Sequence, residues 1–172
     1  DYYIRDTKDM LAAGAPLPAV LGTSAPQKNA ADLRTKGWEL NLNWQDNIDQ
    51  DWSYEVGFVL SDYTSRITRY DLNPNEVLSS YYPGYQFGQI WGFVTDGFFQ
   101  TDEEAAQAHQ SQLYGGQWIA GDIKFKDLNG DKKIDRGKNS VIDPGDQKII
   151  GNNTPRYQFG LNLSLTYKNF DF

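Results

Sequence analysis

The sequence predicts an all-β protein built from antiparallel strands. Three segments alternate apolar and polar residues with a period of two, which is the period of a β-strand and not of a helix. Aromatic residues make up 15% of the 172 residues, a composition that suits strands better than helices. We expect strands at about 38–44, 52–70 and 157–167, with loops at about 5–36 and 71–156.

The first two alternating segments form a predicted hairpin. They are "WELNLNW" and "WSYEVGFVLSDY", and the linker between them, "QDNIDQD", is short and polar, as expected of a turn. The apolar faces consist of Trp38, Leu40, Leu42 and Trp44 in the first strand, and Trp52, Tyr54, Val56, Phe58 and Leu60 in the second.

The third segment, "YQFGLNLSLTY", has the length and composition of a strand that crosses a bilayer. It has about 11 residues, the length that a tilted transmembrane strand needs. Its aromatic residues stand at both ends of an aliphatic stretch, and its other face is small and uncharged. Aromatic girdles around an aliphatic band are typical of outer-membrane β-barrels, so we predict barrel strands. A strand of a soluble β-sandwich is the alternative, because alternation alone does not separate the two.

The connection over residues 71–156 is too long to be a plain loop, so we predict that it has structure of its own. Within it, "TDEEAAQAHQ" predicts a short helix with Thr101 as N-cap and Glu104 completing a capping box. Bacterial barrels have short periplasmic turns and long extracellular loops. By that rule 38–44 runs towards the periplasm and 52–70 runs back, which makes 5–36 and 71–156 extracellular.

The segment "DLNGDKKID", residues 127–135, carries oxygen-bearing side chains at alternate positions. This spacing is that of a loop that wraps oxygen ligands around Ca²⁺. Two positions depart from a complete calcium loop: Lys132 replaces the glycine of the sharp turn, which leaves Gly130 as the candidate, and Lys138 replaces the final carboxylate. The expected ligands are Asp127, Asn129, Asp131, the backbone carbonyl of Lys133, Asp135 and, after an insertion, Asp146.

Two interpretations of this segment stay open. One is a weak structural Ca²⁺ site, with a Kd on the order of 10⁻⁴–10⁻³ M, that staples the loop. The other is a turn-rich loop without an ion, in which the same side chains accept hydrogen bonds from nearby backbone amides. No flanking helices are predicted, so a calcium-driven switch is not expected.

Composition excludes several other classes of function. The formal charge is −7, from 16 basic and 23 acidic residues, which argues against a nucleic-acid partner. There is no cysteine, no apolar run long enough for a transmembrane helix, and no signal-peptide pattern at residue 1. We predict no catalytic residues. His109 is the only histidine, and the acidic pairs Glu103–Glu104 and Asp143–Asp146 are expected to be solvated.

Residues 121–172, "GDIKFKDLNGDKKIDRGKNSVIDPGDQKIIGNNTPRYQFGLNLSLTYKNFDF", are similar to the C-terminal barrel region of SusC/RagA-type TonB-linked outer-membrane receptors of Bacteroidetes. Three further pieces resemble this family in the same order: "KGWELNLNW", "WSYEVGFVLSD" and "GQIWGFVTDGFFQTDEE". Several separate motifs in one order make the resemblance specific at the level of the family. The resemblance is loose over residues 1–35.

The resemblance implies a fragment of a large outer-membrane β-barrel that imports oligosaccharides, or in some members peptides, without being an enzyme. It implies a SusD-type surface lipoprotein as lid, outer-membrane lipid around the wall, and a TonB complex that supplies energy through N-terminal parts. We expect the aromatic residues of 71–156 to pack the loop or contact the lid more than the cargo. The alternatives are a soluble Ca²⁺-dependent carbohydrate-binding β-sandwich and a secreted hydrolase fragment.

Overall fold

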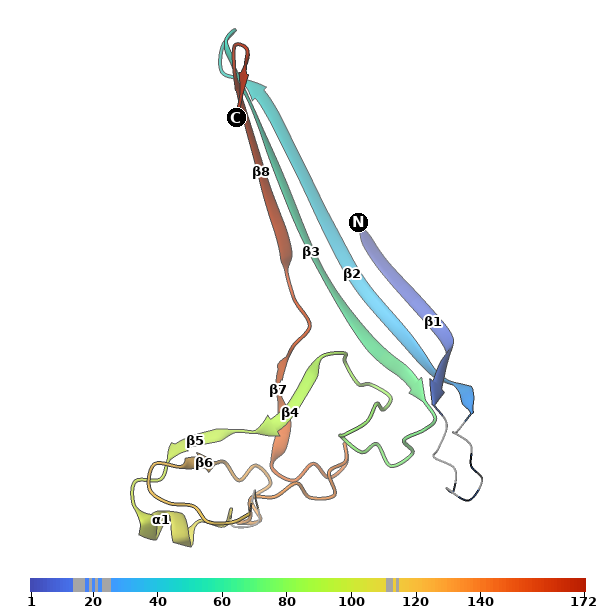
Figure 1. Ribbon diagram of the computed structural model, residues 1–172, viewed down its shortest axis with the longest axis vertical. Helices are drawn as coiled ribbons and strands as arrows, with labels where there is room; N and C mark the ends of the chain where they lie inside the picture. The colour runs from blue at the N-terminus through green and yellow to red at the C-terminus, as the bar shows by residue number, and fades with distance from the viewer. Residues whose placement is uncertain (14–17, 19, 21, 23–25, 111–112, 114) are drawn as a thin grey trace.

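The protein is dominated by a long antiparallel sheet, seen in a computed structural model that describes residues 1–13, 18, 20, 22, 26–110, 113 and 115–172. The strand order is β1-β2-β3-β8-β9 (Figure 1). The all-β prediction with antiparallel strands is thereby confirmed. The strands are β1 (Tyr2–Ala13), β2 (Gln27–Asn47), β3 (Trp52–Tyr70), β8 (Gln158–Tyr167) and β9 (Phe170–Asp171).

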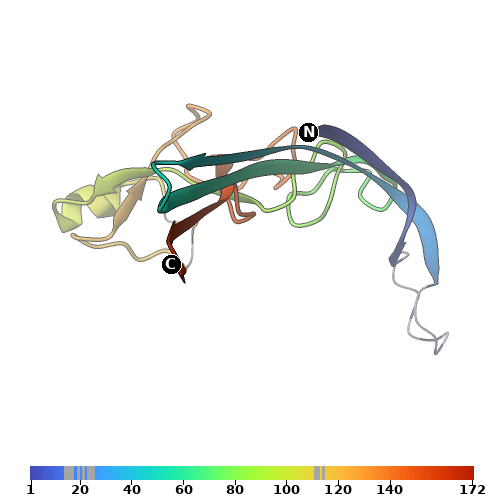
Figure 2. The same cartoon turned by 90° about the horizontal axis from the view of Figure 1, so that it is seen from above.

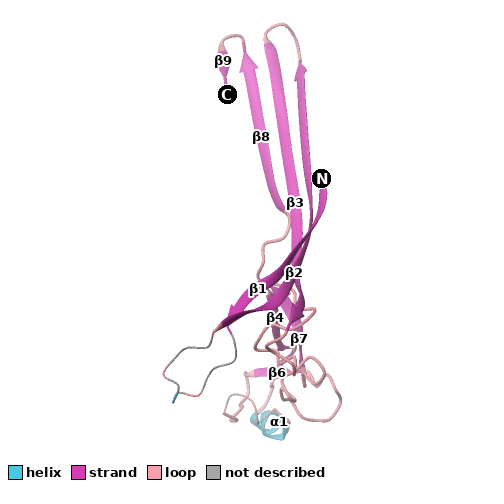
Figure 3. Ribbon diagram, turned by 90° about the vertical axis from the view of Figure 1, so that its right-hand side faces the viewer, coloured by secondary structure: helices cyan, strands magenta, loops and turns pink. Residues whose placement is uncertain are grey.

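Residues 71–156, called the loop region below, form a separate lobe at one end of the sheet. The β2–β3 and β8–β9 hairpins lie at the opposite end (Figures 1 and 3). Within the described ranges, no helix is long and apolar enough to cross a membrane. The loop region contains β4 (Gln89–Phe93) paired with β7 (Gln147–Asn152), β5 (Thr95–Phe98) paired with β6 (Ile123–Phe125), and the helix α1 (Asp102–Gln107).

One face of the sheet is apolar and uncovered. The register places Leu42 opposite Phe58, and Phe58 opposite Leu161, so that apolar residues of three strands form continuous rows. Leu42 is 54% exposed and Leu161 is 59% exposed, values far from those of a protein core. We call these rows the apolar band and this side of the sheet the band face. The band consists of Leu40, Leu42, Trp44, Val56, Phe58, Leu60, Phe159, Leu161 and Leu163.

The opposite face of the same strands is polar and small. Asn43, Gly57 and Asn162 lie in one row across β2, β3 and β8. A Cβ atom on Gly57 would come within 3.0 Å of the Asn43 Oδ1 atom, so glycine makes room for the neighbouring amides. The sheet thus separates an apolar surface from a polar one, which is uncharged along β8 and carries Glu39 and Glu55 on β2 and β3. It is also curved along its length (Figure 2).

The buried core is small and is divided between the junction of the loop region with the sheet and the part of the loop region around α1. Ile67 of β3 is 2% exposed, and Tyr82 and Phe99 of the loop region are 5% and 2% exposed. The sheet beyond this junction has no covering layer, as Figure 3 shows for the strands above the loop region. The other buried apolar residues are Ala30, Ala31, Leu78, Ala105, Leu113 and Ile134.

The predicted loop at 5–36 is wrong over most of its described length. β1 covers residues up to Ala13, and β2 begins at Gln27 instead of near residue 38. The extension of β2 is hidden in the sequence because its residues alternate between charged and small side chains, and β1 has charged side chains on both faces. Thr35, for example, is buried between exposed Arg34 and exposed Lys36. Most of the segment 14–25 lies outside the described residues.

Candidate functional site

The C-terminal end of β3 holds the loop region to the sheet. β3 is longer than its neighbour β8, which pairs with it only from Trp52 to Ser61. Beyond that point, residues 84–87 of the loop region take the place of β8. The amide of Phe87 donates to the carbonyl of Ser65 at 2.9 Å, and the amide of Ile67 donates to the carbonyl of Tyr85 at 2.9 Å. The loop region therefore begins as an added strand of the sheet.

A partly buried ion pair joins β3 to Arg156, two residues before β8 begins. The guanidinium group of Arg156 donates to both carboxylate oxygens of Asp62, whose side chain is only 8% exposed. The ring of Tyr157 lies beside the same guanidinium group, 5.3 Å from ring centre to Cζ. A cavity of about 230 Å³ opens here, lined in part by Tyr63 and Phe87. Its volume is below the usual range of small-molecule sites.

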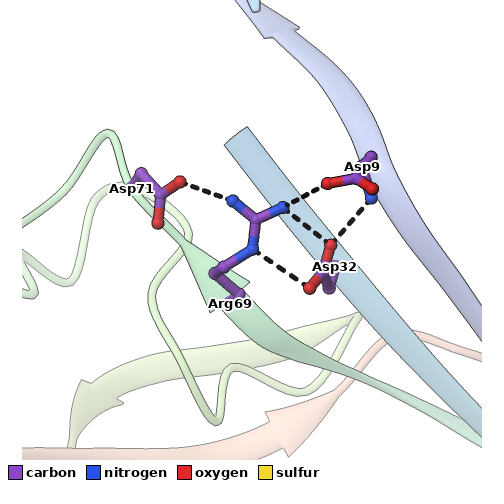
Figure 4. Close-up of polar contacts among 4 residues, drawn as sticks. All are labelled: Asp9, Asp32, Arg69 and Asp71. Carbon is purple, nitrogen blue, oxygen red and sulfur yellow. Dashed lines mark hydrogen bonds and ion pairs between the residues drawn. The ribbon is translucent and has the colours of Figure 1, made fainter. Parts of the chain in front are cut away.

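A second ionic cluster joins the ends of three strands (Figure 4). Arg69 of β3 donates to both carboxylate oxygens of Asp32 of β2, at 3.0 and 2.9 Å, and to Asp9 of β1 at 2.9 Å. It also donates to Asp71 at 2.6 Å, at the first turn of the loop region. Asp9 has a φ of 55° and lies at a shift in the β1–β2 register. The cluster therefore stabilises a bulge in β1 and the start of the loop region together.

Aromatic residues fill the loop region beside β3. Tyr81 contacts Tyr70, Tyr85 and Phe87 with ring centres 5.8, 5.1 and 5.5 Å apart. Burial raises the pKa of Tyr85, with smaller contributions from neighbouring tyrosines. The Nε1 atom of Trp91 donates to the hydroxyl of buried Tyr82 at 3.0 Å. These rings pack mainly against one another. Tyr81, which is 42% exposed, is the most accessible of them.

Helix α1 is fixed by its cap and by a buried glutamine. Thr101 is the N-cap as predicted, and its hydroxyl accepts the Glu104 amide at 3.1 Å. The Glu104 carboxylate accepts the amide of Gln100, one residue before the cap, and pairs with Lys124 at 2.8 Å. The Gln100 amide and, after it, the Lys124 ammonium group lower the pKa of Glu104. Gln110, 1% exposed, joins this segment to β6 through Ile123 and Phe125.

The predicted ion loop is an ordered series of turns. The two carboxylate oxygens of Asp127 accept the amides of Gly130 at 2.6 Å and Lys132 at 2.8 Å. Asn129 and Asp131 accept amides two residues further along, at 3.0 and 2.8 Å. These are the local hydrogen bonds of the ion-free interpretation. Each carboxylate oxygen can accept a second bond, so lone pairs stay available for a hard cation.

The sharp turn of this loop passes through two residues. Gly130 has a φ of 79°, as expected for the predicted turn, but Lys132 also has a positive φ, 64°. A lysine in the left-handed region is strained, so local hydrogen bonds must hold it there. Desolvation raises the pKa of Asp127, but the amides of Lys132, Gly130 and their neighbours outweigh this effect, so its pKa is lowered.

Asp146 is brought back to the loop, as the sequence suggested. It is fully buried, and its two carboxylate oxygens accept the amides of Leu128 at 2.7 Å and Asp135 at 2.9 Å. Asp135 in turn accepts the amide of Gly137 at 2.7 Å. Asp146 therefore ties the two ends of the predicted ion loop together. Across the part of the chain that the structure describes, no three His, Cys, Asp or Glu side chains are grouped as a metal ion needs.

The residues considered for catalysis are not brought together. Asp146 is buried among backbone amides, Glu104 is engaged with the helix cap, and His109 is exposed on the surface. Sequence reasoning missed Arg69, Arg156 and Gln110, which have hydrogen-bond partners 60, 94 and 15 residues away in the chain. Local spacing holds no signal for pairs that distant.

Comparison with curated proteins finds relatives along the whole chain. It is 29% identical to TonB-dependent receptor P3 of Formosa agariphila over 99% of its own length, and 27% identical to receptor P26 of that organism over 100%. Receptor P39 is 25% identical over 100% of the chain. The chain spans only 17–19% of the length of these relatives. No family model matches it.

A solved structure shares the fold. The structure of the RagAB peptide transporter superimposes on 99% of this chain with a TM-score of 0.58 and 17% sequence identity. The match covers 17% of that transporter chain, the same share as in the sequence relatives P3 and P26. At 17% identity, the match supports a shared fold and nothing further.

We predict that Asp146→Ala loosens the whole segment 127–146. The substitution leaves two backbone amides without an acceptor inside the protein, at a cost of about 2–4 kcal/mol. Hydrogen exchange of peptides that cover 127–146 should become faster in the variant. Asp143→Ala removes a neighbouring carboxylate that caps no amide, and its effect should stay within about 0.5 kcal/mol. Equal exchange in the two variants would contradict the role assigned to Asp146.

Proposed function

Because the chain is a segment of a TonB-dependent receptor, we propose that it forms wall and vestibule of an outer-membrane importer of oligosaccharides or other large nutrients. One observation carries this proposal, namely the two-faced sheet. An apolar band that is more than half exposed at Leu42, Trp44 and Leu163 needs an apolar environment, and lipid provides it. The polar row of Asn43, Gly57 and Asn162 suits a water-filled interior.

The lengths of the connections at the two ends of the sheet fix the proposed orientation. The β2–β3 hairpin turn is short, and the loop region at the other end is long. Outer-membrane barrels keep short turns on the periplasmic side and long loops outside the cell. We therefore place the hairpin turn in the periplasm and the loop region on the cell surface. Coupling to the TonB complex is assigned to other parts of the receptor.

A soluble carbohydrate-binding β-sandwich is less well supported. In a sandwich, a second sheet packs on the apolar face at about 10 Å. Here the band face stays open across β2, β3 and β8, and the loop region lies at the end of the sheet instead of over it (Figure 3). A single layer with an uncovered apolar face is the arrangement of a barrel wall.

The loop region has an exposed apolar patch suited to a protein lid. Phe98 of β5 and Ile123 of β6 are opposite each other and are 60% and 41% exposed. Most tyrosines and tryptophans of the region are packed against one another, which leaves few rings free to stack on sugars. We propose that a SusD-type surface lipoprotein covers the Phe98–Ile123 patch. The cargo is an oligosaccharide or, as in the RagAB transporter, a peptide.

Deletion of the full-length receptor gene tests the importer function. We expect the deletion strain to lose growth on at least one oligosaccharide or peptide nutrient while it keeps growth on the corresponding monomer. The monomer is the control, because it is small enough to pass through general porins. Unchanged growth and unchanged binding of every polymeric nutrient tested would contradict an importer.

Substitution of the patch tests the lid. Phe98→Ser with Ile123→Ser, made in the full-length receptor, should reduce the amount of lipoprotein that co-purifies from outer membranes about tenfold or more, because two apolar anchors are lost. Ile142→Ser is the matched control, since Ile142 is 88% exposed but lies outside the patch. Co-purification that is unchanged in the double variant, or equally reduced in the control, would refute this assignment.

We also propose that Ca²⁺ staples the loop at residues 127–135. The support is the oxygen-rich donor set of Asp127, Asn129, Asp131 and Asp135, together with the return of Asp146 to the ends of the loop. The carbonyl of Lys133 would add a backbone ligand. The ion would have no catalytic part and would act by ordering the surface of the vestibule.

Calcium addition and removal test this staple in the purified receptor. At a concentration ten times its Kd, calcium should slow hydrogen exchange of residues 127–146 about tenfold, by mass action on the ordered state. A chelator should reverse the effect, and Asp131→Ala should abolish it. Glu103→Ala removes an exposed acid outside the loop and should leave it intact. If calcium changes nothing in the parent protein, the carboxylates serve the turns alone.

A further inference from the structure

Three basic side chains gather on the band face just beyond the apolar band. Arg34 and Lys36 of β2 and Arg66 of β3 line a hollow of about 540 Å³ together with Thr64. The β2–β3 register runs without a shift from Leu33 to Asn47, so alternation puts Arg34 and Lys36 on the same face as Leu40. All three basic residues are exposed.

The hollow has more basic side chains than acidic partners among the described residues. Arg34 and Arg66 are direct cross-strand partners, an unfavourable placement for like charges. Arg34 is paired with Asp6 of β1 at 2.6 Å, whereas Arg66 donates only to the neutral amide of Gln86, at 3.2 Å. Among the described residues, no carboxylate pairs with Lys36 or Arg66.

In the proposed membrane orientation, the cluster would lie at the level of lipid headgroups. Trp38 and its cross-strand neighbour Tyr2 form an aromatic row at the border of the apolar band that faces the loop region. Aromatic girdles mark the boundary between hydrocarbon and headgroups. At the rise of a β-strand, Lys36 and Arg34 lie roughly 7 and 13 Å beyond Trp38 along β2. This is the depth at which the phosphate groups of outer-leaflet lipids lie.

We propose that Arg34, Lys36 and Arg66 form a binding site for the phosphate headgroup of an anionic glycolipid in the outer leaflet. This rests on the proposed membrane orientation and adds a ligand on the outside of the wall. Arginine offers paired donors to phosphate oxygens, and lysine adds a point charge. An anion between Arg34 and Arg66 also removes the repulsion between them.

Continuity with the apolar band favours a lipid over a soluble anion. On the same face and the same strands, the hollow is followed by the row of Trp38 and Asp62 and then by the row of Leu40 and Leu60. The Asp62 carboxylate is neutralised by Arg156, so it leaves no free negative charge between the hollow and the apolar band. Acyl chains attached to a phosphate held in the hollow would run along the apolar band, whereas inorganic phosphate would make no use of it. The lipid is therefore recognised by two adjoining surfaces, one cationic and one apolar.

Native mass spectrometry of the full-length receptor in detergent tests the site, with lipid A as the probe. We expect the parent to retain phosphorylated lipid A. Lys36→Gln with Arg66→Gln should weaken retention about tenfold to thirtyfold, because two basic residues near an anionic headgroup are lost. Lys138→Gln with Lys148→Gln removes the same charge from exposed positions of the loop region and should change little. Lys36→Arg with Arg66→Lys should keep binding.

Three results would overturn the site. They are equal retention by the two Gln double variants, equal retention of dephosphorylated lipid A by the parent, and competition by inorganic phosphate as strong as that by lipid A. Membrane fractionation and nutrient uptake of the same variants separate this inference from the proposed function. A receptor that is found in the outer membrane and imports normally, but fails the lipid test, refutes only the lipid site. A receptor absent from the outer membrane refutes both.

Discussion

The pairing of residues 84–87 with the C-terminal end of β3 is the constraint on which the rest of the structure depends. Pairing between β3 and β8 ends at Ser61. The backbone donors and acceptors of β3 from Ser65 to Ile67 therefore need another partner. The loop region supplies it, and everything from Tyr81 to Trp91 is positioned by that short ladder. The Asp62–Arg156 pair joins β3 to the residue two positions before β8, so the sheet and the end of the loop region are linked here as well.

The residues of the band face change in character along β2 in the order that the proposed membrane orientation requires. Along β2, the residues of this face change from Leu42 and Leu40 to Trp38 and then to Lys36 and Arg34. Hydrocarbon, interface and headgroups each favour one of these residue types, and the order matches the order of depth in a membrane. A soluble protein has no reason to arrange apolar, aromatic and basic residues along one exposed face in this way.

Sequence reasoning finds the strands whose apolar residues alternate and misses those whose alternation is polar. The prediction at 52–70 and the observed β3 share their bounds, because Trp52 to Leu60 alternate strongly. The N-terminal part of β2 is not predicted from the sequence, because Thr35 and Gly37 are buried there without being apolar. The Arg69 cluster could not be found, since Asp32 and Asp9 lie 37 and 60 residues away and only the register brings them together.

The segment 127–146 shows why a loop region with a small core needs buried hydrogen-bond acceptors. Few apolar side chains are available to order residues 127–146, where Ile134 is the buried one. Asp146 supplies the missing constraint, because its two oxygens hold Leu128 and Asp135 from a fully buried position. The spacing of acids in "DLNGDKKID" thus serves the turns first, and a calcium ion would add to an order that hydrogen bonds already establish. Buried hydrogen-bond acceptors can therefore order such a surface without the large hydrophobic core that a soluble domain requires.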